Sequence, residues 1–297
     1  MHKTRDEKYI MTYHYSTTTR EMRFLDADQP DGELRVVQPR IEGLEYYAAH
    51  HKGRFFISNN ENARNFKVSV APVQKPGKEN WKELVAHRED VLIEGVSTFE
   101  NHLVIRARKA GLQQLRICTP DDLGNARYVQ FPEPVYYVEF EDNSVFETKI
   151  LRFKYSSLIT PHTVVDYHMD SGEWEVRKQD VIAGYNKDDF VTDRIFATAS
   201  DGTQVPISVA YRKSVKMDGG NPALLHGYGA YGSNLDAEFS PHRISLLDRG
   251  FVYAIGHVRG GSDMGREWYE SGRVLHKKNS FTDFIACAEH LIQLGFT

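Results

Sequence analysis

The sequence has only two cysteines and no long apolar run. Cys118 and Cys287 lie far apart in the chain, and two cysteines cannot build a disulfide framework, so we expect two buried thiols and a reducing, cytoplasmic setting. No stretch approaches the ~18 apolar residues of a membrane-spanning helix. The charged start of the chain lacks the apolar segment of a signal peptide. We therefore expect no membrane partner.

Positive charge is not in excess either. The formal net charge is -4 and charged residues make up 26% of the chain, so the sequence predicts no basic surface for nucleic acid. None of the 13 histidines is spaced with cysteines or carboxylates as a metal ligand would be. We expect neither a metal nor an organic cofactor. At 297 residues, two domains are favoured over one.

Residues 1–180 consist of short strand-like runs separated by turns. Ile10, Ile57, Ile105 and Phe153 occupy such runs at a nearly constant step of about 48 residues. A step of this size, with three or four strands in each unit, is typical of propeller blades. A β-sandwich with evenly spaced strands is the alternative, but it gives no reason for one constant step. We predict about four blades and expect the amino-terminal blades of the ring to be missing from this chain.

The pattern changes after residue 190. A hairpin is predicted over 194–211, with Asp201 and Gly202 in its turn. Pro206 suggests that its second strand is an edge strand. A strand over 223–226, a helix over 243–248 and a strand over 251–257 follow. A hairpin followed by alternating strands and helices is the beginning of an α/β-hydrolase sheet.

The last element is the clearest helix. Ser280 is a suitable N-cap, and Asp283 would lie near the positive end of the helix. Gly295 would end it. Helical spacing predicts one apolar face, formed by Phe281, Phe284, Ile285, Ala288, Leu291 and Ile292.

The loop after the strand at 223–226 matches the G-x-G-x-x-G pattern over residues 227–232. A dinucleotide site would need a helix to begin at the third glycine and an acidic residue at the end of the next strand. Instead, Ser-Asn-Leu-Asp follows the glycines, and the next strand ends in His257 and Arg259. We reject a dinucleotide site.

The same loop, together with Arg-Gly-Gly-Ser at 259–262, resembles the prolyl oligopeptidase family of serine peptidases, and within it oligopeptidase B most closely. The resemblance implies that Tyr228 donates its hydroxyl to the oxyanion of the reaction intermediate. The tyrosine that opens the family's loop is replaced by His226. The alternative for Tyr228 is an aromatic side chain that packs only for stability.

No G-x-S-x-G nucleophile motif occurs in the chain. Ser262 is not followed by a glycine two residues on or by a good helix start, so we do not assign it as the nucleophile. Arg259 is expected to make structural hydrogen bonds. Glu94, Glu139 and Asp142 are candidates for lining a propeller channel, with solvated surface charge as the default. In the α/β-hydrolase order, the catalytic triad is expected beyond residue 297.

The sequence thus predicts a mixed β and α/β fold, a partial β-propeller followed by the first part of an α/β-hydrolase domain. The predicted boundaries are 1–180 for the carboxyl-terminal blades, 181–190 for a linker and 191–297 for the amino-terminal part of the peptidase domain. The resemblance implies a cytoplasmic serine oligopeptidase that cleaves short peptides, after basic residues, through an acyl-enzyme. The alternative is a non-catalytic propeller module that binds a partner and carries an inactive hydrolase remnant. The oligomeric state and the choice between basic and proline sites stay open.

Overall fold

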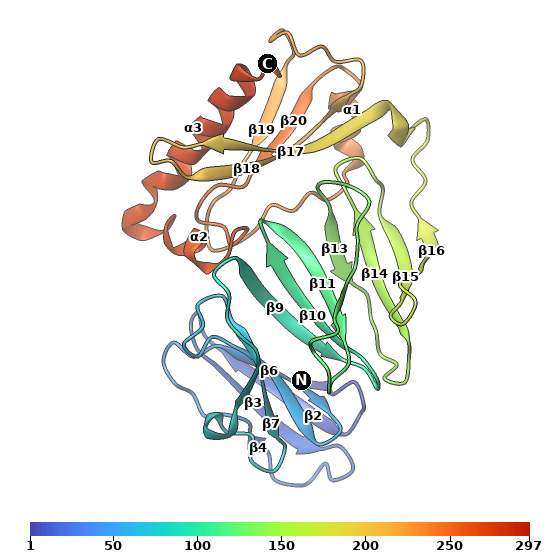
Figure 1. Ribbon diagram of the computed structural model, residues 1–297, viewed down its shortest axis with the longest axis vertical. Helices are drawn as coiled ribbons and strands as arrows, with labels where there is room; N and C mark the ends of the chain where they lie inside the picture. Colours follow the sequence, from blue (N-terminus) through green and yellow to red (C-terminus); the bar gives the residue numbers. More distant parts are fainter.

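The computed structural model describes residues 1–297 and contains five sheets of four strands each. The first four are antiparallel, and each is built from four strands consecutive in the sequence (Figure 1). In chain order the strands of these four sheets are β1 (His2–Lys3), β2 (Tyr9–Tyr15), β3 (Arg20–Asp26), β4 (Arg35–Val36); β5 (Tyr46–His51), β6 (Arg54–Asn59), β7 (Lys67–Pro72), β8 (Lys82–Val85); β9 (Val91–Thr98), β10 (Leu103–Lys109), β11 (Leu112–Cys118), β12 (Arg127–Tyr128); and β13 (Tyr137–Phe140), β14 (Ile150–Ser156), β15 (Thr163–His168), β16 (Trp174–Gln179).

The repeat seen in the sequence is the repeat of these sheets. Ile10, Ile57, Ile105 and Phe153 lie in β2, β6, β10 and β14, which are the second strands of their four sheets. Four-stranded antiparallel units that repeat in this way are blades. The predicted partial propeller is confirmed.

Neighbouring blades are joined by apolar cores. Phe24 of the first blade packs with Phe55 of the second in one fully buried cluster, with ring centroids 5.1 Å apart. Phe56 of the second blade shares another cluster with Leu103 of the third. Burying faces of two sheets against each other removes apolar area from water at roughly 25 cal/mol per Å². Each blade therefore depends on its neighbours for its core.

The fifth sheet mixes antiparallel and parallel strands in the order β17–β18–β20–β19. Strands β19 and β20 run parallel, and α3 lies along the sheet (Figure 1). This is the predicted beginning of an α/β-hydrolase sheet. Its elements are β17 (Phe190–Thr198), β18 (Gln204–Arg212), β19 (Ala223–His226), α1 (Pro241–Leu247), β20 (Val252–Gly256), α2 (Arg266–Glu270) and α3 (Lys278–Gln293); three 3-10 turns, Lys78–Asn80, Lys187–Asp189 and Val274–His276, complete the structure.

The prediction that Pro206 marks an edge strand is wrong. Its strand, β18, pairs with β17 on one side and with β20 on the other. The proline is tolerated because the ladder between β18 and β20 covers residues 207–210 of β18 and begins one residue after it. On the side of β18 that faces β20, Pro206 makes one backbone hydrogen bond, in which its carbonyl accepts the His257 N–H at 2.9 Å. A missing N–H costs nothing where no partner strand continues.

The orientation of α3 also differs from the prediction. The helix begins at Lys278, so Ser280 is inside it and does not cap it. The buried side carries Ser280, Asp283, Ala286, Cys287 and Leu291. Part of the predicted apolar face points outward, since Phe281, Ile285 and Ile292 are each more than half exposed. Buried polar contacts made by Ser280 and Asp283, described below, set this rotation.

Both thiols are buried, as the sequence predicts, and neither forms a disulfide. Burial raises the pKa of Cys118 to about 11 and that of Cys287 to about 12. Among the helices, none combines the length and the apolar character needed to cross a membrane. The side chains contain no group of three or more His, Cys, Asp or Glu arranged to hold a metal ion.

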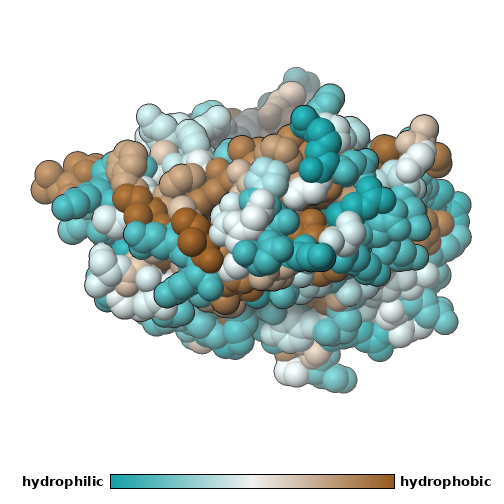
Figure 2. Space-filling view, turned by 90° about the horizontal axis from the view of Figure 1, so that it is seen from above, coloured by the Kyte–Doolittle hydropathy of each residue, from teal (hydrophilic) through white to brown (hydrophobic).

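We expect this chain to self-associate in solution. Strand β19 has a partner on one side only, and Phe281 and Ile285 expose 63% and 55% of their surface. Figure 2 views the molecule from the α/β end and shows apolar side chains gathered on this face. Open strand edges beside apolar surface favour association. In sedimentation velocity, Phe281→Lys with Ile285→Lys should shift the distribution toward monomer, whereas a monodisperse unsubstituted monomer would contradict the expectation.

Candidate active site

The candidate site lies where β19 and β20 end. The two strands are parallel neighbours, with His226 opposite Ile255 in the register. Their carboxyl ends therefore meet at the same edge of the sheet, which is where open α/β sheets place their sites. The two loops that follow, residues 227–232 and 257–265, come together at this edge.

Glycines allow the two loops to touch through their backbones. Gly229 has a φ of 64°, and a Cβ added there would lie 2.8 Å from the carbonyl oxygen of Arg259. Gly260 has a φ of 102°, and its added Cβ would lie 2.0 Å from the carbonyl oxygen of Gly229. The Gly232 N–H donates to the Gly260 carbonyl at 2.9 Å. Larger residues at 229 and 260 would push the loops apart.

These contacts agree with the rejection of a dinucleotide site. No helix begins at Gly232, and the next helix, α1, starts only at Pro241. The glycines serve loop packing instead of phosphate binding at a helix end.

Tyr228 is in this loop, directly before Gly229, and its side chain is 51% exposed. Lys277, directly before α3, holds the loop, because its Nζ donates to the Gly229 carbonyl. The one hydroxyl hydrogen of Ser280, in α3, is donated to the Arg259 carbonyl at 2.5 Å, and the Gly229 carbonyl lies 3.2 Å from the same oxygen. The structure thus places Tyr228 on a fixed loop at the expected edge, and its role as a donor stays a prediction.

Arg259 has the structural role that the sequence predicts. Its Nε and Nη2 donate to the two carboxylate oxygens of Asp283 at 2.9 and 2.6 Å, and its backbone N–H donates to the same carboxylate at 2.9 Å. Nη1 donates to Asp201, in the β17–β18 turn, at 2.6 Å. The hydrogen bond from Arg259 lowers the pKa of Asp201 to about 2. Arg259 therefore joins a strand end, a turn and α3.

Ser262 has no catalytic surroundings. Its backbone N–H donates to Asn234 Oδ1 at 2.9 Å, and the nearest helix, α2, begins four residues later. That short helix does form, with Gly265 before its first residue, where the sequence suggested a poor start. A nucleophile elbow needs the helix directly after the serine, so the structure agrees in not assigning Ser262 as the nucleophile.

A buried hydrogen-bonded chain escaped the sequence analysis. Ser208 Oγ and His257 Nε2 are 2.8 Å apart, and His257 Nδ1 is 3.0 Å from Asp263 Oδ1. This is the order of partners in a serine peptidase triad. All three side chains are less than 5% exposed, so no substrate carbonyl has access to Ser208. These hydrogen bonds fix the loop after β20. No sequence motif links Ser208 to His257, which lies 49 residues further along the sequence.

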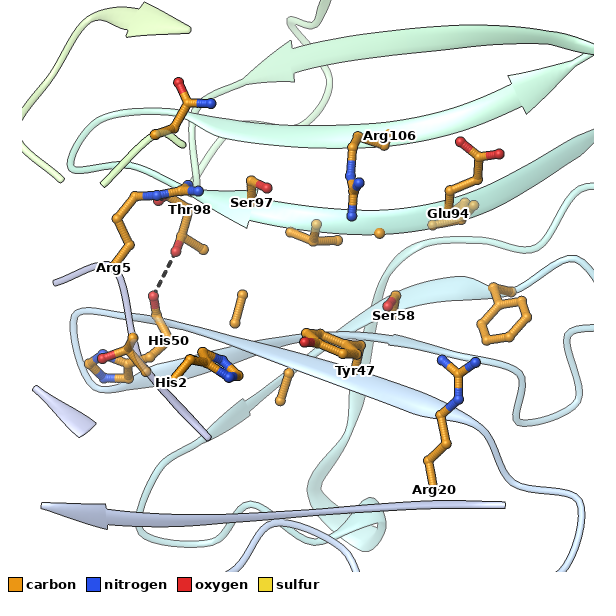
Figure 3. Close-up of a pocket in the computed structure, with 18 of the residues that line it drawn as sticks. His2, Arg5, Arg20, Tyr47, His50, Ser58, Glu94, Ser97, Thr98 and Arg106 are labelled. Carbon is orange, nitrogen blue, oxygen red and sulfur yellow. Dashed lines mark hydrogen bonds between the residues drawn. The ribbon is translucent and has the colours of Figure 1, made fainter. Parts of the chain in front are cut away.

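A large hollow lies among the blades, whose side chains form most of its lining (Figure 3). It has a volume of about 1030 Å³, and inner strands β5 and β9 contribute much of its wall. Glu94 and Asp142 line it, as do Ser262 and Arg266 from the α/β half, whereas Glu139 lines a smaller cavity of about 320 Å³. Tyr228 lines neither this hollow nor a second one, of about 860 Å³, at the junction of the two halves.

Comparison with protein families gives two matches. Residues 1–180 match the prolyl oligopeptidase N-terminal β-propeller domain, and residues 237–297 match the prolyl oligopeptidase family. Among curated proteins, the chain is 40% identical over 296 residues to dipeptidyl aminopeptidase BI of Pseudoxanthomonas mexicana. It is 33% identical over 296 residues to protease 2 of Moraxella lacunata.

Solved structures agree with these matches over the whole chain. Oligopeptidase B from Trypanosoma brucei, with covalently bound antipain, superposes with a TM-score of 0.92 at 35% identity. Oligopeptidase B from Leishmania major superposes with a TM-score of 0.90, also at 35% identity. The chain covers 43% of each of these structures. It covers 40% and 42% of the two curated relatives, although the matches take in 99% of the chain itself.

Proposed function

The chain belongs to the prolyl oligopeptidase family, and from this membership we propose that it is part of a serine oligopeptidase that hydrolyses short peptides through an acyl-enzyme. The observation that carries the proposal is the combination of propeller blades with a sheet whose β19 ends in the Tyr228 loop. A propeller packed over an α/β site would admit only short, unfolded peptides.

The proposed chemistry is acyl transfer. A serine hydroxyl attacks the scissile carbonyl while a general base takes its proton, and the carbonyl oxygen becomes an oxyanion. Tyr228 donates its hydroxyl hydrogen to that oxyanion. The C–N bond then breaks, the base returns the proton to the leaving amine, and water hydrolyses the acyl-enzyme. The serine and the base are assigned to residues outside this chain, because the chain contains no G-x-S-x-G motif.

Cleavage after basic residues is the finer proposal. It is supported by the 35% identity to two structures of oligopeptidase B. The relative at 40% identity is named a dipeptidyl aminopeptidase, so release of dipeptides from a free amino terminus is the second candidate. The two differ in whether a blocked amino terminus is accepted.

We expect this chain to have no peptidase activity, and a form extended to the length of its relatives to be active. A fluorophosphonate serine probe should leave residues 1–297 unlabelled and label the extended form once. The extended form should cleave an Arg-containing peptide with a blocked amino terminus faster than its Pro counterpart. Cleavage only of unblocked peptides would replace oligopeptidase activity by dipeptide release.

Two results would overturn the proposal. Stoichiometric labelling of Ser262 in the present chain would place the nucleophile where the geometry does not. An extended form that neither reacts with the probe nor cleaves peptides would leave the non-catalytic binding module as the function.

A further inference from the structure

We propose that Arg5 and Arg106 form a carboxylate-binding site in the large hollow, which holds the carboxyl-terminal carboxylate of a bound peptide. The site rests on the proposed function in so far as its ligand is a peptide. It is separate from the Tyr228 loop and belongs to the blades.

Both guanidinium groups face the hollow from different blades. Arg5, in the first blade between β1 and β2, donates from Nη1 to the Thr98 carbonyl of β9 at 2.9 Å. Arg106, in β10, lies opposite Gly95 of β9 in the register. Figure 3 shows Arg106 extending across β9 and Arg5 reaching toward Thr98. The two side chains therefore converge on the same strand.

Neither arginine has an acidic partner. The acidic residues that line the hollow are Glu7, Glu45, Glu94 and Asp142, and none of them pairs with either arginine; Glu7 pairs with Lys3 at 3.7 Å. Glu94 accepts from Arg108 Nε at 2.9 Å, and Glu45 pairs with Arg20 at 3.2 Å and with Arg266 at 3.4 Å. Asp142 is exposed and makes no ion pair. Nε of Arg106 is buried without a hydrogen-bond partner.

The surroundings hold these two charges in place at an electrostatic cost. The guanidinium carbon of Arg5 lies 4.3 Å from the Phe99 ring centroid, and that of Arg106 lies 5.1 Å from the Phe140 ring centroid. A Cβ added at Gly95 would lie 2.6 Å from Arg106 Nη2, so the absence of a side chain there lets the guanidinium lie directly over β9. Burial and the nearby charge of Arg106 lower the pKa of Arg5 to about 10. Two like charges arranged without a counter-ion fit an anionic ligand.

A peptide carboxylate suits this position better than a free anion. Ser262 and Arg266 of the α/β half line the same hollow as the two arginines. A peptide that enters the hollow beside these two residues would reach the blades, and in this proposal its carboxyl terminus meets the planar forks of Arg5 and Arg106. Arginine binds carboxylates with two parallel hydrogen bonds.

The test compares three peptides on the immobilised 297-residue chain by surface plasmon resonance, which does not require a monomer. The peptides are acetyl-pentaalanine as the free acid, the same peptide as the carboxamide, and acetyl-Ala-Ala-Glu-Ala-Ala carboxamide. We expect the free acid to bind about 10- to 100-fold more tightly than the carboxamide. If the Glu peptide bound as tightly as the free acid, the site would recognise a side-chain carboxylate as well as a terminal one, and the assignment to the carboxyl terminus would be wrong.

Variants tie the preference to the two arginines. Arg5→Gln and Arg106→Gln should each reduce binding of the free acid toward the level of the carboxamide and leave carboxamide binding unchanged. Arg106→Lys, which keeps the charge without the planar fork, should retain part of the preference. Arg249→Gln, an exposed arginine in the α/β half, is the control and should change nothing. Melting by circular dichroism should show no loss of stability, since each variant removes one of two unpaired like charges.

Equal binding of the free acid and the carboxamide would overturn the proposal, as would a preference that survives both glutamine variants. If Arg106→Gln does not fold, Arg5→Gln and Arg106→Lys still test whether the preference for the free acid depends on the two arginines. A failed serine-probe experiment with an intact carboxylate preference would reject the peptidase and not this site.

Discussion

Replacing Tyr228 by phenylalanine is expected to lower kcat by about 10²–10³-fold, or roughly 3–4 kcal/mol, in a form of the protein extended to the length of its relatives. The substitution removes one hydroxyl and keeps the ring. The oxyanion exists only in the transition state and the intermediate, so KM should change little. Stability should also be retained, because the side chain is 51% exposed. Steady-state kinetics and a thermal melt on one preparation measure both effects.

Tyr231 provides the matched control for this experiment. It lies in the same loop and is 86% exposed, so Tyr231→Phe removes an equivalent hydroxyl without touching the proposed donor. Its kinetics should equal those of the unsubstituted protein. An unchanged kcat in Tyr228→Phe, with a lower melting temperature, would instead identify Tyr228 as a packing residue.

The blades could be predicted because their signal is local and repeated. The step that relates Ile10 to Ile57 and Ile105 is carried by strand-forming residues at equivalent places in three blades. The end of the strand at 223–226 could be predicted for a similar reason, since Gly227 follows it at once, and β20 ends at Gly256, one residue before its predicted end. The repeated spacing of strand-forming residues predicts the blades correctly because it equals the spacing of the strands in the structure.

The rotation of α3 could not be predicted from apolar spacing. Ser280 and Asp283 are polar, and periodicity assigns them to the solvent side. They are buried because Ser280 Oγ donates to the Arg259 carbonyl and Asp283 accepts hydrogen bonds from Arg259. Hydrogen-bond partners more than 20 residues away in the sequence therefore determine which face of α3 is buried. The Ser208–His257–Asp263 chain was missed for the same reason, because its members share no local pattern.

Asp283→Asn is expected to destabilise the α/β half by about 3–5 kcal/mol, because it leaves Arg259 buried without its main counter-ion. For a structure of this size the loss corresponds to a fall in melting temperature of roughly 10 °C. Asp283 is fully buried and accepts three hydrogen bonds from Arg259. Scanning calorimetry or circular dichroism measures the shift.

Asp201→Asn is the control, because it removes the other carboxylate that binds Arg259. Asp201 is half exposed, so water replaces part of the lost interaction and the melting temperature should fall by only a few degrees. Its pKa, lowered to about 2 by Arg259, also predicts a pH dependence. The stabilisation is complete above the ordinary aspartate pKa of about 4 and is lost as the pH falls toward 2. The melting temperature of Asp201→Asn should therefore fall less between pH 4 and pH 2 than that of the unsubstituted protein. If Asp201→Asn and Asp283→Asn lower the melting temperature equally at pH 7, burial does not set the strength of the Arg259–Asp283 pair.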